Sequence, residues 1–156
     1  DLPLTWHFIG PLQSNKTRVV AEHFDWVHSV DRLKIARRLS EQRPDELPPL
    51  NLCLQVNISG EASKAGVSLD ELPGLASEVA SLPRLKLRGL MAIPAPQADP
   101  DQQRAPFAAL QQSLAALQHG LDGLDTLSMG MSRDLEAAIA EGATVLRIGT
   151  DVFGPR

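Results

Sequence analysis

Two loops in the second half of the chain carry residue types that suit a bound phosphate. The first, Ser128–Asp134, combines Gly130 with Ser132, a residue type that often caps the start of a helix. The second, Arg147–Thr150, offers a glycine N–H and a hydroxyl. Free N–H groups and the positive dipole end of a helix attract anions, so we expect the two loops to form one phosphate site. The alternative is that Ser132 only starts a helix and that the glycine of the second loop only makes a turn.

A single arginine stands in the second of these loops, at the end of a predicted strand. Arg147 lies between Leu146 and Ile148, so its side chain should point away from theirs and into the interior of the fold. A buried arginine needs a polar partner. The sequence leaves two possibilities open, a ligand or a structural ion pair with Asp134 or Glu136.

The remaining polar candidates favour structural roles. His7 and His28 fall within predicted strands, and we interpret both as hydrogen-bonded core histidines. Asn57 ends a strand and is either a polar site residue or a turn former. Cys53, the one cysteine, lies in an apolar run and is predicted to be a buried structural thiol. The histidines show no metal-ligand spacing with it, so we predict no metal site.

Short apolar strands alternate with amphipathic helices along the whole chain. Strands are predicted over residues 5–9, 26–30, 50–58, 87–93, 126–129 and 144–148. Helices are predicted over 15–23, 31–42, 68–81, 105–119 and 132–141, with a polar loop over 95–104. Ser68 and Glu71 read as a capping box at the start of the third helix.

This alternation predicts an α/β fold with a parallel sheet. The length of the units is close to that of an eightfold barrel, so we predict a TIM (β/α)8-type barrel with about six of the eight strand–helix units in this chain. A doubly wound open sheet is the rival, but it normally carries a glycine-rich fingerprint after its first strand. Neither G-x-G-x-x-G nor G-x-x-x-x-G-K occurs here. In a barrel, loops after the last two strands commonly hold a phosphate.

Composition narrows the class of protein. The 156 residues are 43 % hydrophobic and 22 % charged, which suits one globular domain. A net charge of −4 argues against a nucleic-acid partner, which needs clustered positive charge. No stretch approaches the roughly 20 apolar residues of a membrane span. A single cysteine fits a reducing compartment, and we expect a cytoplasmic protein.

Several motifs in the order of the chain carry a family resemblance. They are Trp6–Gly10, Leu12–Lys16, Val56–Ile58 followed by Lys64 and Gly66, Gly89–Pro94, Leu127–Asp134, Arg147–Thr150 and Phe153–Gly154. Together they resemble the pyridoxal 5′-phosphate (PLP) homeostasis family. The resemblance implies a barrel like the barrel domain of alanine racemase. It further implies a protein that binds PLP as a Schiff base and helps to control the supply of this vitamin B6 cofactor, with no firm enzyme activity.

The resemblance also assigns roles to six residues. It implies phosphate contacts from Ser132, Gly149 and Thr150, an approach of Arg147 to the pyridine nitrogen, and a ring pocket lined by Asn57 and Met91.

One departure from the family pattern concerns the Schiff-base lysine. The family carries it on the first barrel strand, upstream of the motif that here starts at Trp6. We therefore interpret residues 1–156 as a single PLP-binding barrel domain that is incomplete at its N-terminus, and we expect no covalent PLP binding by this chain. The expected partners are PLP and PLP-dependent apoenzymes, and the expected state is a monomer.

Two enzyme readings compete with a PLP carrier. A PLP-dependent racemase-like enzyme needs a second base, which is a tyrosine in the resembling racemases, and this chain has no tyrosine. An arginine at the pyridine nitrogen would also disfavour protonation of the ring and weaken it as an electron sink. A barrel enzyme acting on a phosphorylated sugar would need acid/base carboxylates, for which Asp134 and Asp151 are the nearby candidates. These points favour the carrier.

Overall fold

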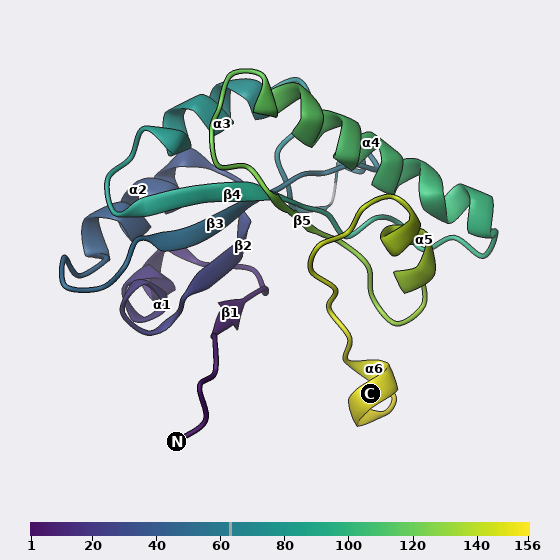
Figure 1. Ribbon diagram of the computed structural model, residues 1–156, viewed down its shortest axis with the longest axis horizontal. Coiled ribbons are helices and arrows are strands. Elements are labelled where there is room, and N and C mark those ends of the chain that lie inside the picture. Colours follow the sequence, from purple (N-terminus) through teal and green to yellow (C-terminus); the bar gives the residue numbers. More distant parts are fainter. Residues whose placement is uncertain (63) are drawn as a thin grey trace.

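Five parallel strands form one curved sheet in which each strand pairs with the next along the chain (Figure 1). The computed structural model describes residues 1–62 and 64–156. The strands are β1 (His7–Phe8), β2 (Trp26–Val30), β3 (Leu50–Gln55), β4 (Leu85–Met91) and β5 (Thr126–Ser128). Strands in sequential order with parallel pairing are the arrangement of a barrel wall. The α/β prediction is therefore confirmed, and the structure contains a curled five-stranded part of such a wall.

The connecting segments are helical, and the longer helices cover the convex side of the sheet (Figure 1). They are a 3-10 turn η1 (Ser14–Lys16), α1 (Thr17–His23), α2 (Leu33–Gln42), α3 (Leu72–Ala80), α4 (Pro100–Gln118), α5 (Leu135–Ala140) and α6 (Thr150–Phe153). In the part of the chain that the structure describes, no helix has the length and apolar character to cross a membrane.

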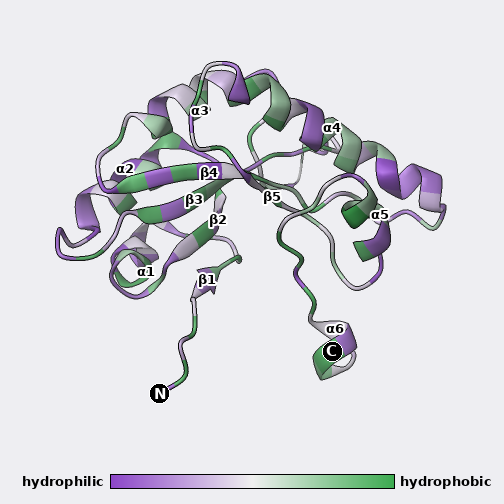
Figure 2. Cartoon of the chain, in the orientation of Figure 1, coloured by the Kyte–Doolittle hydropathy of each residue, from purple (hydrophilic) through white to green (hydrophobic). Residues whose placement is uncertain are grey.

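The two faces of the sheet differ in polarity, because side chains alternate along each strand. Leu50, Leu52 and Leu54 of β3 are fully buried in the core beneath the helices. The residues between them, among them Asn51 and Cys53, belong to the concave face. Figure 2 shows the resulting alternation of hydrophobic and hydrophilic residues along β3 and β4. The core therefore sits between sheet and helices, and the concave face is free to carry polar groups.

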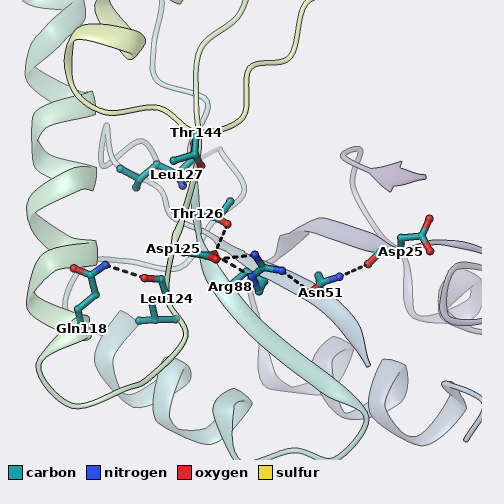
Figure 3. A network of polar contacts seen from close by, with 9 residues as sticks. All are labelled: Asp25, Asn51, Arg88, Gln118, Leu124, Asp125, Thr126, Leu127 and Thr144. Carbon is teal, nitrogen blue, oxygen red and sulfur yellow. Dashed lines mark hydrogen bonds and ion pairs between the residues drawn. The ribbon is translucent and has the colours of Figure 1, made fainter. Parts of the chain in front are cut away.

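A polar cluster occupies the concave face toward the starts of the strands (Figure 3). Arg88 Nε and Nη2 donate to the two carboxylate oxygens of Asp125 at 3.0 and 2.7 Å, and Nη1 donates to Asn51 Oδ1 at 3.1 Å. The guanidinium carbon also lies 4.7 Å from the ring centroid of Trp26. The hydrogen bond from Arg88 lowers the pKa of Asp125. Residues at this end of a parallel barrel serve stability rather than chemistry.

The prediction of a sixth strand over residues 144–148 is wrong. Only Val145 forms an isolated bridge, to Ser128. The N–H groups of Thr144 and Val145 share the Leu127 carbonyl as acceptor, at 2.9 and 3.2 Å. This sharing interrupts the even ladder of a parallel pair, so the segment follows β5 without becoming a regular strand.

The helices start at other residues than predicted, most clearly α4 and α3. The region 95–104 is a loop only in its first half, because α4 begins at Pro100 with Asp99 as N-cap, whose side chain accepts from Asp101 N–H at 3.0 Å. Proline is favoured at this first helical position, so Pro100 marks the start of the helix in the sequence. Helix α3 begins at Leu72 with Glu71 as its N-cap, so the predicted capping box from Ser68 is wrong, although Ser68 Oγ still accepts from Glu71 N–H at 3.2 Å.

Candidate functional site

Arg147 lies against the C-terminal ends of β4 and β5, on the concave face. Its Nη1 donates to Ser128 Oγ at 2.6 Å and its Nη2 donates to the Ala92 carbonyl oxygen at 2.9 Å. The interior orientation predicted from strand alternation is confirmed. The two partners are neutral, so the alternative of an ion pair with Asp134 or Glu136 is not what holds the side chain. Burial lowers the pKa of Arg147, yet a guanidinium stays charged in proteins.

A line of hydrogen-bonding side chains continues from Arg147 across the concave face. Ser128 Oγ lies 2.7 Å from His28 Nδ1, and His28 Nε2 lies 2.8 Å from His7 Nδ1. In a flat sheet β2 and β5 would stand three strand spacings apart, about 14 Å. A direct contact between His28 and Ser128 therefore requires the sheet to curl tightly enough for side chains to meet across its hollow.

Both histidines of this line are hydrogen-bonded, as expected, but only His28 lies in the interior, so the prediction of a core position is wrong for His7. His28 is buried, with 1 % of its surface exposed, whereas His7 at β1 is exposed. Burial lowers the pKa of His28 to about 4, and the neighbouring charges of His7 and Arg147 act in the same direction. Burial also lowers the pKa of His7, against an opposing effect of Asp25. Both rings are therefore neutral at neutral pH.

The two loops expected to hold a phosphate lie side by side. Asp151, in the first turn of α6, donates its N–H to Ser132 Oγ at 3.3 Å. Gly149 directly precedes α6 and Thr150 is its first residue. A hollow of about 620 Å³ is bordered by both Ser132 and Asp151 and by residues of α4 and α5. One hydroxyl and the start of one short helix thus face the same region.

Ser132 is not the N-cap of the following helix, as the sequence had suggested. Helix α5 begins at Leu135, and Asp134 occupies the cap position. The Asp134 carboxylate accepts from Met131 N–H at 2.7 Å and closes a tight turn over residues 131–134. Because that turn precedes the helix, Ser132 stands outside it, and its hydroxyl is left to contact α6.

Gly130 allows this turn to pack closely against neighbouring side chains of the protein. Its φ is +102°, a conformation that side chains rarely adopt. A Cβ atom at this position would come within 2.7 Å of Ala138 Cβ and of Leu146 Cδ2. The glycine thus seats the loop that carries Ser132 against α5 and the last extended segment.

Met91 and Asn57 lie at the same end of the sheet, with different surroundings. Met91 ends β4, is fully buried, and is the Cα partner of both Gln55 and Ser128. Asn57 follows β3 and its Nδ2 donates to the Glu61 carbonyl oxygen at 2.6 Å. The amide therefore shapes the loop after β3, in line with its alternative reading as a turn former.

Five of the six candidate residues thus gather into two groups at one end of the sheet, and the sixth, Asn57, belongs to the loop after β3. Met91 and Arg147 flank Ser128, whereas Ser132 lies beside Gly149 and Thr150. Sequence reasoning did not count Ser128 and His28 as site residues. The signal was present, since His28 alternates with the core residue Val27 and must face away from the helices.

Comparison with known proteins identifies the family of the chain. The family described as "Alanine racemase, N-terminal domain" matches residues 4–156. A protein of Pseudomonas aeruginosa named "Pyridoxal phosphate homeostasis protein" is 69 % identical over 156 residues, which are 100 % of this chain and 66 % of that protein. The chain therefore spans about two thirds of the length of this curated relative.

Solved structures resemble the chain closely. PipY of Synechococcus elongatus PCC7942, solved without PLP, gives a TM-score of 0.90 at 42 % identity and covers 98 % of this chain and 73 % of its own. The same protein solved with PLP bound gives 0.89 at 40 % identity, over 98 % and 72 %. The resemblance inferred from the motifs is confirmed, and the chain belongs to the family of alanine racemase N-terminal domains.

Proposed function

We propose that this chain binds PLP and takes part in intracellular PLP homeostasis, as a carrier without a catalytic activity of its own. The observation that carries the proposal is the junction of the two loops, where Ser132 Oγ accepts from the first turn of α6 while Arg147 lies on the concave face nearby. Relatives named for PLP homeostasis and a similar structure solved with PLP bound support the same ligand.

The donor set fits an anionic group linked to an aromatic base. The Ser132 hydroxyl and the backbone N–H groups of Gly149 and Thr150 are the donors we assign to the phosphate. Arg147 can only donate, so it would bond the lone pair of the pyridine nitrogen. Met91 and Asn57 would border the ring.

These assignments favour a carrier over an enzyme. PLP supplies an electron sink for carbanion chemistry, and that sink is strongest when its ring nitrogen is protonated. A permanently charged guanidinium beside the nitrogen opposes this protonation. The names of the relatives also describe homeostasis rather than a reaction.

We further propose a setting for the domain. Residues 1–156 act as a single PLP-binding domain. Its curled sheet is part of a complete (β/α)8 barrel, and the protein is a cytoplasmic monomer. Its partners are PLP and the apoenzymes that receive PLP. The parallel, sequential sheet supports the barrel, and the single buried cysteine fits a reducing compartment.

The decisive experiment is an equilibrium titration of PLP with the gene product that contains this chain. Arg147→Ala should weaken binding by about 1.5–3 kcal/mol, the value of a charge-assisted hydrogen bond. Arg37→Ala, which removes an exposed arginine of α2, is the matched control and should bind as the wild type does. Unchanged affinity of Arg147→Ala would return this residue to a structural role, and absence of binding by the wild type would reject the function.

A further inference from the structure

We infer that Ser128 and His28 are positioning residues for Arg147, in a hydrogen-bond chain that runs in one direction from Arg147 through Ser128 and His28 to His7. The chain connects the guanidinium at the ends of β4 and β5 with an exposed ring on β1. The part of this inference that concerns PLP rests on the function proposed above, whereas the direction of the chain follows from the donors and acceptors alone.

The direction is set at the arginine end. A guanidinium has no acceptor atom, so Ser128 Oγ must accept from Arg147 Nη1 at 2.6 Å. The serine hydroxyl retains one proton to donate. In the part of the chain that the structure describes, its other hydrogen-bonding neighbour is His28 Nδ1, at 2.7 Å.

The reverse direction would leave a buried proton without an acceptor. If His28 donated from Nδ1, Ser128 Oγ would accept twice and its own O–H would need a third partner. Ser128 is fully buried, and a buried donor without a partner is costly. Ser128 therefore donates to His28 Nδ1.

The tautomers of both rings follow from this step. With its Nδ1 accepting, a neutral His28 carries its proton on Nε2 and donates to His7 Nδ1 at 2.8 Å. His7 in turn carries its proton on Nε2. Two charged groups act on these rings, Asp25 on His7 and Arg147 on His28. Burial keeps the pKa of His28 low.

The chain explains how Arg147 is held without a carboxylate. Its guanidinium is fixed by two neutral acceptors, Ser128 Oγ and the Ala92 carbonyl oxygen. Such acceptors orient the guanidinium without themselves carrying a negative charge, which suits a ligand that offers a lone pair. Ser128 can serve only while His28 takes its proton, so His28 acts on Arg147 through Ser128.

The direction can be tested on the 156-residue chain without any ligand. Long-range ¹⁵N–¹H NMR at neutral pH distinguishes a protonated from an unprotonated ring nitrogen. We expect His28 and His7 each to be protonated on Nε2 and not on Nδ1. Protonation of His28 on Nδ1 would overturn the inference.

The positioning role is tested by PLP titration of the gene product in a double-mutant cycle. Ser128→Ala should weaken PLP binding about three- to tenfold, the value of one hydrogen bond. Ser29→Ala is the matched control, because Ser29 is also buried but donates to the Gly10 carbonyl oxygen. In an Arg147→Ala background, Ser128→Ala should have almost no further effect. An equal loss in both backgrounds would show that Ser128 does not act through Arg147.

A second pair of variants covers the case in which Ser128→Ala fails to fold. His28→Asn keeps an acceptor for the Ser128 hydroxyl, whereas His28→Leu removes it. We expect PLP affinity to be retained in the first and weakened about three- to tenfold in the second, and equal affinities would overturn the positioning role. If the wild type binds no PLP, the proposed function fails. The NMR result still decides whether the hydrogen-bond chain runs from Arg147 to His7.

Discussion

The neutral ring of His28 makes the stability of this protein depend on pH. Its pKa is about 4 in the folded state, against 6.5 when unfolded. Above pH 6.5 both states carry a neutral ring and this residue contributes no pH dependence. As the pH falls from 6.5 to 4, the unfolded state binds a proton at His28 that the folded state does not bind. The free energy of unfolding should therefore decrease by about 3 kcal/mol over this interval.

This dependence can be measured by urea unfolding at a series of pH values. His28→Asn has no ring to protonate, so the difference in stability between wild type and variant should change across this range. His23→Gln, at the exposed end of α1, is the matched control and should follow the wild type. Parallel curves for wild type and His28→Asn would contradict the assignment.

A second residue-scale prediction concerns the thiol of Cys53. Burial raises its pKa from 9.0 to about 12, so the reactive thiolate is about a thousandfold rarer than in the unfolded chain at the same pH. Alkylation by iodoacetamide at mildly alkaline pH should be very slow in the native protein. In denaturant the same thiol should react rapidly. Rapid modification of native protein would show that the concave face opens around Cys53.

At the scale of elements, Gly89 determines how closely β4 and β5 can pair. A Cβ atom at Gly89 would fall on the Thr126 carbonyl oxygen of the neighbouring strand. Gly89→Ala should therefore destabilise the protein by about 3 kcal/mol or more, because backbone must move rather than a flexible side chain. The measurement is the midpoint of denaturant unfolding.

The matched control for Gly89 is a glycine in open space. A Cβ atom at Gly74, in α3, would meet nothing within 4 Å. Gly74→Ala should stabilise the helix by about 0.5–1 kcal/mol. If the two alanine variants changed stability alike, close strand approach would not be what Gly89 provides.

Elements with strong periodicity could be predicted from the sequence, whereas their ends and their contacts across the sheet could not. Trp26–Val30 was predicted at its observed bounds, because alternation and flanking helices define it. The start of α5 was wrong, because the Asp134 carboxylate closes a turn ahead of the helix. The contact between His28 and Ser128 joins residues 100 positions apart, and it depends on a curvature that no local pattern encodes.

At the scale of the whole molecule, the attachment of PLP can be separated from its recognition. The family resemblance puts the reactive lysine upstream of Trp6, so the chain of 156 residues should acquire no stoichiometric PLP adduct after borohydride reduction. Peptide mapping and intact mass measure this. The Pseudomonas aeruginosa relative, treated in the same way, is the comparison, and we expect one adduct there. A single modified lysine in the short chain would identify another anchor.

The sequential order of the strands also bears on how the protein is made. Each strand pairs with the one synthesised just before it, so β1 to β4 can assemble in turn as the chain leaves the ribosome, with one helical crossover to close at each step. The link from His28 to Ser128 is different, since its two halves emerge 100 residues apart. It forms only when β5 has joined and the sheet has curled. Arg147 is thus held in place only after β5 has joined the sheet.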